Sequence, residues 1–143
     1  MSWHILQRWF NVPPWRDAEF IIDNRGEKFW FSWSDGYEDY AKLRLYHRGL
    51  PAGHVNLIEE EGQGRIILAD ICLSARYRKR GLGKQVMKMI IQWAKQSGFQ
   101  RIQGGIVPRE DMSLAYLQEW YIRQGFKVIQ ERRIYLDLGS YQR

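Results

Sequence analysis

Hydrophobic and polar positions change their period along the chain, and these changes mark the elements. Strict alternation in 42–46 predicts a half-buried strand, whereas the nearly continuous apolar run from Arg65 to Leu73 predicts a strand covered on both faces. From Val86 the apolar residues recur every three or four positions until Gly98, which predicts an amphipathic helix with a left-handed glycine cap. Residues 65–98 therefore form a central strand, a basic glycine loop and a helix.

The rest of the pattern predicts a meander of strands followed by a second helix. Asn24-Arg25-Gly26 is a hairpin signal between two β-rich runs, and turn residues continue in this way up to the central strand. After the first helix we expect a strand at 101–107, then a helix capped by Asp111 or Ser113 and ended at Gly125. The other expected strands are 19–23, 28–33, 53–59, 126–129 and 133–138. The fold class is α/β (α+β), with a mixed, mostly antiparallel sheet of about seven strands and helices packed against it.

Length and composition fit one globular domain over residues 1–143, because 45% of the residues are hydrophobic and 27% are charged. No stretch reaches the roughly 20 apolar residues of a membrane helix, and the first ten residues do not resemble a signal peptide. We therefore expect a cytoplasmic protein with no membrane partner. Three scattered histidines indicate no metal site. The single Cys72 excludes an intramolecular disulfide and is expected to be a small core residue rather than a nucleophile.

The net charge of +6 could indicate a nucleic-acid partner, but the densest cluster of basic residues lies in the glycine loop. The first turn of a helix leaves backbone N–H groups unpaired and carries partial positive charge, so a phosphate group is well bound there. Gly81 and Gly83 allow the backbone to approach such a ligand closely. We expect a bulky residue at Gly83 to weaken binding severely, and the loss of Lys79 or Arg80 to cost less. The clustered cations are Arg76, Arg78, Lys79, Arg80 and Lys84.

The spacing within the loop excludes two common phosphate motifs. The dinucleotide fingerprint requires a third glycine where Val86 stands, and the P-loop requires a longer spacing that ends in Gly-Lys-Ser/Thr. The remaining pattern, Arg78-x-x-Gly81-x-Gly83 after a buried strand, resembles the pyrophosphate-binding motif Gln/Arg-x-x-Gly-x-Gly/Ala of the GNAT (GCN-five-related) N-acetyltransferase superfamily. Tyr121-Ile122-Arg123-Gln124-Gly125-Phe126 resembles the Tyr-x-x-x-Gly-Phe signature of the same superfamily. The two motifs occur in the family's order and separation.

This resemblance covers roughly residues 53 to 138 and implies transfer of an acetyl group from acetyl-CoA directly to an amine of an unidentified acceptor, without a metal. In the family, two parallel strands splay apart after a bulge and receive the pantetheine arm; their equivalents here are 65–73 and 101–107. The resemblance assigns pantetheine binding to backbone groups of Leu73 and protonation of the departing thiolate to Tyr121. The implied cofactor-binding residues are Cys72, Leu73, Arg78, Lys79, Arg80, Gly81, Leu82, Gly83 and Lys84.

The residue that accepts the amine's proton is open at this stage. Asp70 is the first choice because its strand lies beside the thioester, although a structural Asp paired with a basic neighbour is an equally good interpretation. Tyr121 could likewise be a core tyrosine. The other candidate carboxylates are Glu59, Glu60, Glu61, Glu110 and Asp111.

Two departures from the family pattern concern the acceptor and the second helix. Family members usually have helices between their first two strands, where this chain predicts a hairpin and the polar stretch 34–40. An Asn is usual seven residues before the signature Tyr, where this chain has Leu114. Two other functions stay open: a non-catalytic acyl-CoA-binding or regulatory module on the same fold, and an RNA-binding domain that uses the basic loop. The N-terminal aromatic residues could cap the core or form a homodimer contact; they are Trp3, Trp9, Phe10 and Trp15.

Overall fold

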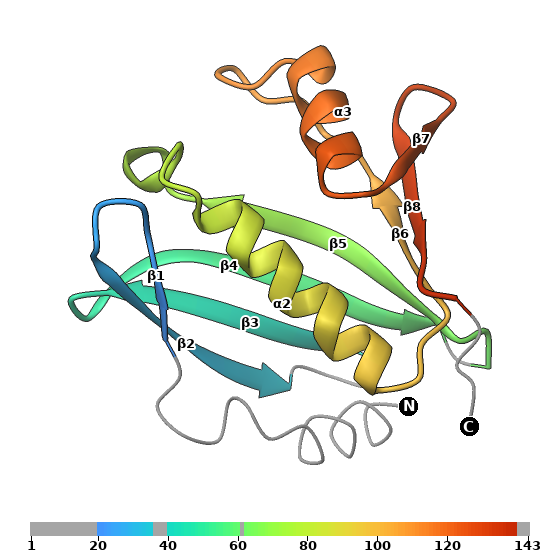
Figure 1. The fold of residues 1–143 in the computed structure, drawn as a ribbon, viewed down its shortest axis with the longest axis horizontal. Helices are drawn as coiled ribbons and strands as arrows, with labels where there is room; N and C mark the ends of the chain where they lie inside the picture. The colour runs from blue at the N-terminus through green and yellow to red at the C-terminus, as the bar shows by residue number, and fades with distance from the viewer. Residues whose placement is uncertain (1–19, 36–39, 61, 140–143) are drawn as a thin grey trace.

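The computed structural model describes residues 20–35, 40–60 and 62–139. Within these ranges, eight strands form one sheet in the order β1-β2-β3-β4-β5-β6-β8-β7 (Figure 1). The strands are β1 (Phe20–Ile22), β2 (Lys28–Asp35), β3 (Tyr40–His47), β4 (Leu50–Glu60), β5 (Arg65–Leu73), β6 (Arg101–Gly105), β7 (Lys127–Ile129) and β8 (Arg133–Asp137). The helical elements are η2 (Ala75–Tyr77), α2 (Leu82–Gln96) and α3 (Leu114–Arg123). The expected mixed α/β class is confirmed, with eight described strands instead of about seven.

Strands β1 to β5 form the expected antiparallel meander. The β1–β2 turn is stabilised by Asp23, whose Oδ1 accepts hydrogen bonds from the backbone N–H groups of Arg25 (2.9 Å) and Glu27 (2.8 Å). The β3–β4 turn is tighter than expected. Arg48 and Gly49 both have positive φ, 52° and 81°, as in a two-residue type I′ hairpin, and β4 therefore begins at Leu50.

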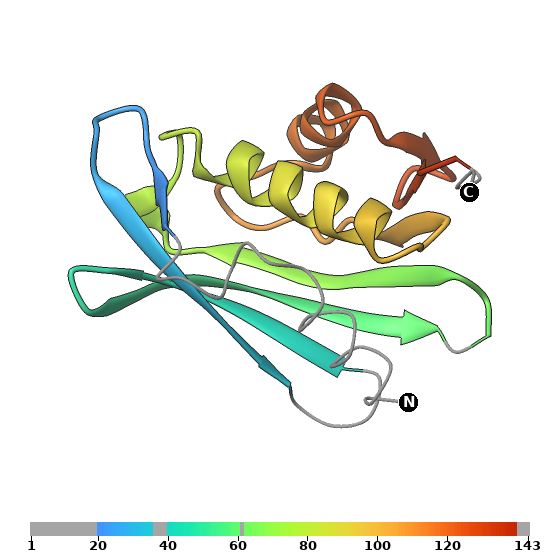
Figure 2. The same ribbon diagram turned by 60° about the horizontal axis from the view of Figure 1, so that its bottom comes forward.

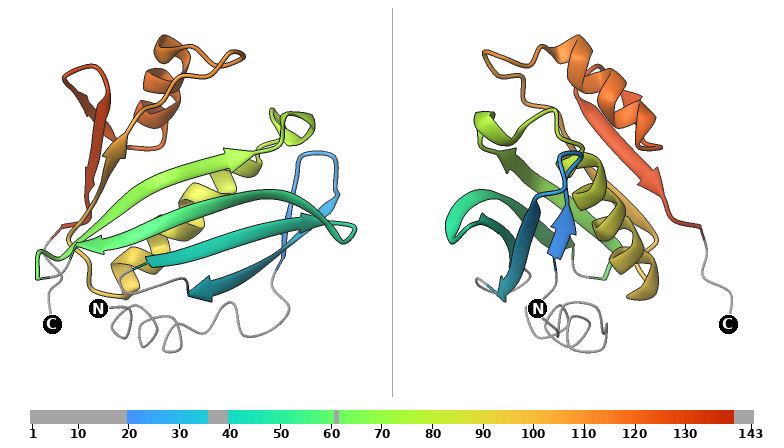
Figure 3. Two further views of the ribbon diagram at one scale, coloured as in Figure 1. Left: turned by 180° about the vertical axis from the view of Figure 1, so that it is seen from behind. Right: turned by 60° about the vertical axis from the view of Figure 1, so that its left-hand side comes forward.

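Helix α2 lies across one face of the sheet, and α3 lies on the same side (Figure 2). Seen from behind, β3, β4 and β5 have no described helix in front of them (Figure 3). Gly98 follows α2 with a φ of 87°, which confirms the predicted cap. Met87 is fully buried, whereas Met89 is only partly buried. The buried residues of α2 are Leu82, Val86, Met87, Ile90, Trp93 and Ala94.

Strands β5 and β6 form the only parallel pair among the described strands, and they separate after four residue pairs. The pairing runs from Arg65 opposite Arg101 to Leu68 opposite Gly104. Ala69 is an extra residue relative to β4, because Leu68 pairs with Leu57 but Asp70 pairs with Asn56. After this bulge β5 stays paired with β4 but no longer with β6, and the ribbons of β5 and β6 diverge (Figure 1). The predicted splayed pair is therefore confirmed.

Glycine is required where the two strands are still paired. A Cβ at Gly104 would lie 2.8 Å from the carbonyl oxygen of Leu68, too close for any larger residue without a shift of the backbone. Strand β6 ends one residue later, at Gly105, two residues earlier than the sequence predicts.

Several sequence-based expectations fall partly or wholly outside the described residues. These are the N-terminal aromatic residues Trp3, Trp9, Phe10 and Trp15, the segment 36–39, and the candidate carboxylate Glu61. Cys72, expected in the core, is only half-buried near the end of β5. No helix within residues 20–35, 40–60 and 62–139 is long and apolar enough to cross a membrane.

Candidate active site

A groove with a cavity volume of about 190 Å³ forms where β5 and β6 separate. Its walls are the second half of β5, the glycine loop, the residues that follow β6, and one face of α3. The elements that carried the two sequence motifs therefore meet around one cavity.

Most of the residues singled out from the sequence line this groove. They are Asp70, Leu73, Arg78, Lys79, Gly81, Gly83, Lys84 and Tyr121. Three others do not: Cys72, Arg80 and Leu82 are absent from the lining. Leu82 is buried in the core, and Arg80 points toward the β1–β2 turn.

The glycine loop ends in an uncapped helix N-terminus. Gly81 has a φ of 80° and provides no side-chain hydrogen bond to α2. The first N–H groups of α2, from Leu82 to Lys84, therefore have no carbonyl partner within the helix. A Cβ at Gly83 would lie 3.2 Å from Cζ2 of Trp120, so this glycine also allows α2 and α3 to approach each other. The loop thus combines free donors with close helix packing.

Arg78 connects the two sides of the groove. Its Nε donates to the carbonyl oxygen of Leu73 (3.1 Å), and its Nη1 donates to Asp111 Oδ2. The side chain is only 19% exposed. The Leu73 carbonyl is therefore already hydrogen-bonded, and Asp111 is engaged in an ion pair instead of capping α3. Ser113 is the cap, because its Oγ accepts a hydrogen bond from the N–H of Tyr116 at 3.1 Å.

The loop cations have different environments. Lys79 and Lys84 are exposed and line the groove, where they add positive charge beside the helix N-terminus. Arg76 is also exposed and lies over the ring of Tyr77, with 5.1 Å from Cζ to the ring centroid. Arg80 is mostly covered and faces Asp23. Lys79 and Lys84 are therefore the loop cations best placed to meet an anionic ligand.

Tyr121 combines a packed ring with access to the groove. The residue is 5% exposed, and its ring makes edge contacts with Trp120 (5.0 Å between centroids) and Phe126 (5.6 Å). Burial raises the pKa of Tyr121 to about 12, and the negative charge of Asp70 adds to this while Arg109 opposes it. The hydroxyl therefore stays protonated at neutral pH and is available as a proton donor.

Asp70 lies at the centre of a half-exposed polar cluster that we call the groove cluster: His54, Asp70 and Arg109. Asp70 Oδ2 accepts a hydrogen bond from His54 Nε2 (3.0 Å), and Oδ1 lies 3.4 Å from Arg109 Nη2. The side chains of Asp70 and His54 are 39% and 32% exposed. His54 could not be predicted from the sequence, because it is 16 residues from Asp70 and only the β4–β5 register brings the two together.

The other candidate carboxylates among the described residues do not line the groove. Glu60 pairs with Arg65 (3.4 Å), Glu59 is 8% exposed, and Glu110 is exposed. Asp70 is thus the only acidic residue among the described residues that line the cavity. The structure leaves it as the best-placed of the original candidates.

The sequence of residues 2–126 matches the acetyltransferase (GNAT) family. The chain belongs to the GNAT family. The match includes the glycine loop and the Tyr121 signature, and it ends before β7 and β8, which complete the sheet. No curated protein sequence matches the chain.

Solved structures show the same fold at low sequence identity. Nourseothricin acetyltransferase is 15% identical with a TM-score of 0.58, over 90% of this chain and 96% of that one. The ribosomal-protein-S18-alanine N-acetyltransferase from Escherichia coli is 15% identical with a TM-score of 0.62, over 75% of this chain and 74% of that one. An acetyltransferase from Bacillus subtilis in complex with CoA is 20% identical with a TM-score of 0.57, over 70% of this chain and 78% of that one.

Proposed function

We propose that this GNAT domain transfers the acetyl group of acetyl-CoA directly to an amine of an acceptor molecule. The observation that carries the proposal is that one groove has an uncapped helix N-terminus at its loop side and is also lined by Tyr121 and Asp70. The same cavity could therefore bind the acetyl donor and supply the residues that transfer protons.

The groove has the features that a CoA donor requires. The free N–H groups of the first turn of α2 can bind pyrophosphate, and Lys79 and Lys84 contribute positive charge beside them. Related structures from Bacillus subtilis and Thermoplasma acidophilum are described in complex with CoA, which supports this ligand. Acetyl-CoA supplies an acetyl group activated as a thioester.

The remaining residues provide the proton transfers. As the amine nitrogen attacks the carbonyl carbon and the carbon–sulfur bond breaks, Tyr121 donates its proton to the departing sulfur. The amine loses a proton in the same reaction. Asp70 accepts that proton directly or through a water molecule, while His54 holds the carboxylate in place. The tyrosine is returned to its protonated form from solvent.

The test is incubation of the protein with labelled acetyl-CoA and a panel of amines, with release of free thiol measured in parallel. Transfer of label to an amine, with one thiol released per product, is the expected result. CoA binding without transfer to any amine would favour a non-catalytic acyl-CoA-binding module. Salt-dependent RNA affinity that acetyl-CoA does not displace would favour an RNA-binding domain.

A further inference from the structure

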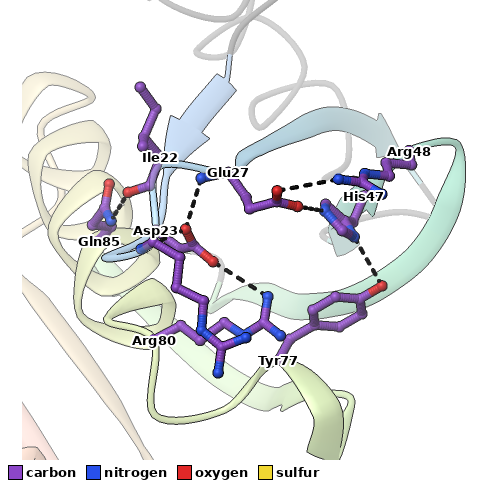
Figure 4. A network of polar contacts seen from close by, with 9 residues as sticks. Ile22, Asp23, Glu27, His47, Arg48, Tyr77, Arg80 and Gln85 are labelled. Carbon is purple, nitrogen blue, oxygen red and sulfur yellow. Dashed lines mark hydrogen bonds and ion pairs between the residues drawn. The ribbon is translucent and has the colours of Figure 1, made fainter.

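A second polar cluster, which we call the hairpin frame, lies beside the glycine loop but outside the groove. It consists of Asp23, Glu27, His47, Tyr77 and Arg80, which come from the β1–β2 turn, β3, η2 and the loop (Figure 4). None of these residues lines the groove. The proposed reaction therefore gives them no role.

Arg80 and the β1–β2 turn are bonded through both side chain and backbone. Arg80 Nη1 lies 3.4 Å from Asp23 Oδ2, and the side chains are 15% and 0% exposed. The N–H of Asn24 donates to the carbonyl oxygen of Arg80 at 3.0 Å. Burial alone would raise the pKa of Asp23, but the N–H donors of Glu27 and Arg25, together with Arg80, hold it below its ordinary value. The carboxylate is therefore charged at neutral pH.

Tyr77 holds η2, the helical turn that precedes the glycine loop, against the same part of the molecule. It is 2% exposed, its ring lies 5.4 Å from the guanidinium of Arg80, and its hydroxyl lies 3.1 Å from His47 Nδ1. His47 Nε2 donates to Glu27 Oε1, so that one imidazole ring connects Glu27 to the Tyr77 hydroxyl. Gln85 Nε2, in the first turn of α2, donates to the carbonyl oxygen of Ile22. The β1–β2 hairpin therefore contacts the glycine loop and the first turn of α2 directly, and it is linked to η2 through His47 of β3.

The loop needs external support because its backbone is unusual. Lys79 has a φ of 61°, in the left-handed region that a residue with a Cβ seldom adopts. Gly81 follows at 80°. Such a conformation persists only where surrounding contacts enforce it. Arg80, which lies between these two residues, makes such contacts on one side of Lys79, and Arg78 makes others on the opposite side.

We propose that Asp23 is a positioning residue for donor binding: through Arg80, it holds the loop in the shape that presents the α2 N-terminus and Lys79 to pyrophosphate. This inference rests on the proposed function above. Arg80 is then a structural cation that does not bind phosphate. Asp23 controls the affinity for the donor without touching it.

The test uses Asp23→Asn, which keeps the size of the side chain and removes its charge. We expect the affinity for CoA, measured by titration calorimetry, to fall about tenfold, the loss expected when a coupled charged pair is broken. The KM for acetyl-CoA should rise by the same factor, with kcat at saturation changed less than about twofold. Acetyl-pantetheine lacks the pyrophosphate, so its kcat/KM should not change.

Three further variants separate positioning from general destabilisation. Asp137→Asn removes one partner of the exposed Arg101–Asp137 pair (2.8 Å), far from the loop, and should leave CoA affinity unchanged. Arg80→Gln combined with Asp23→Asn should weaken CoA binding no more than Asp23→Asn alone, because both changes break one interaction. Arg80→Lys keeps the charge but loses the planar fork, and should show the same loss for CoA and none for acetyl-pantetheine.

Circular dichroism and the unfolding temperature establish which variants are folded, and Arg80→Lys replaces Asp23→Asn in the comparison if the latter is not. Unchanged CoA affinity in the folded variant overturns the inference, and so does an equal loss of kcat/KM with both donors. If the parent protein binds no CoA, the proposed function itself is wrong. If the parent protein binds CoA and Asp23→Asn does not change that affinity, only the positioning role of Asp23 is wrong.

Discussion

The hairpin frame and the groove cluster lie in different surroundings, and the contrast indicates what each can do. In the frame, the Asp23 side chain is fully buried, and its two oxygens are engaged by two backbone N–H groups and one guanidinium. In the groove cluster, the side chains of His54, Asp70 and Arg109 are between 32% and 39% exposed. Asp23 therefore has little capacity to accept a new partner, whereas the groove cluster is open to one.

Burial and hydrogen bonding therefore separate a positioning role from a chemical one. A buried carboxylate with all its bonds made fixes geometry, because any change of partner leaves an unpaired charge. A half-exposed carboxylate can exchange a protein partner for a substrate or water. Asp23 and Asp70 are the same residue type, but their surroundings suit them to different tasks. The following predictions test this distinction.

The largest expected effect comes from Tyr121→Phe, which keeps the ring and removes only the proton donor. Turnover should fall by a factor on the order of 10 to 10⁴, the upper range being typical of lost general acid catalysis. Acetyl-CoA affinity should change little, because the packing against Trp120 and Phe126 is kept. Steady-state kinetics and calorimetry measure both. If the folded variant turns over at the parental rate and the chemical step is rate-limiting, Tyr121 has a structural role only.

Asp70→Asn tests the groove cluster directly. We expect kcat/KM to fall by a factor on the order of 10², at the lower end for general base catalysis, and the acidic limb of its pH profile to disappear. The affinity for CoA should stay normal, in contrast to Asp23→Asn. An unshifted profile with a normal rate would remove Asp70 as the proton acceptor. A loss of CoA affinity would instead show that Asp70, like Asp23, affects donor binding, and the proposed difference between the two carboxylates would be wrong.

His54→Gln refines the same test by removing the imidazole ring beside Asp70. If His54 holds the carboxylate, kcat/KM should fall by less than it does for Asp70→Asn, roughly tenfold, with CoA affinity kept. A loss larger than that of Asp70→Asn would indicate that His54 itself accepts the proton. The pH dependence of kcat/KM for both single variants and the double variant provides the comparison.

Gly83→Leu acts at the first turn of α2, where the helix lines the groove. The added side chain meets the ring of Trp120, because even a Cβ lies 3.2 Å from it. We expect a loss of stability of about 1–3 kcal/mol, as for overpacked sites, together with a severe loss of acetyl-CoA affinity. Lys88→Leu, on the exposed side of α2, is the control and should change neither quantity much. CoA affinity unchanged in a folded Gly83→Leu variant would place the donor elsewhere.

The smallest effects concern pH, and they have opposite signs at the two sites. Folding raises the pKa of Tyr121 above its ordinary value of 10.0, so its contribution to stability is present below pH 10 and is lost as the pH rises toward 12. Folding lowers the pKa of Asp23 below 3.8, so its contribution is present above that pH and is lost as the pH falls through the lower native value. Urea unfolding across both ranges should show two losses of stability, and Tyr121→Phe and Asp23→Asn should each diminish one of them.

The sequence alone determined the elements that carry the candidate site. The central strand β5 was predicted with the bounds Arg65 to Leu73 that the structure has, and the loop, the first helix and the Tyr121 signature were found at their observed places. Such features depend on the period of hydrophobic residues and on motif spacing, and both can be read within one short segment of the chain. For the same reason the hairpin at Asn24 to Gly26 and the cap at Gly98 were predictable.

Only the tertiary structure decided which side chains meet. His54 reaches Asp70 because of the β4–β5 register, and the bulge at Ala69 sets which residues beyond it share a face. Arg80 and Lys79 are neighbours in one basic run, yet one is turned toward Asp23 and the other lines the groove. These outcomes depend on partners 16 and 57 residues away. Local periodicity does not predict such partners, because strand pairing and loop contacts depend on packing across the whole sheet.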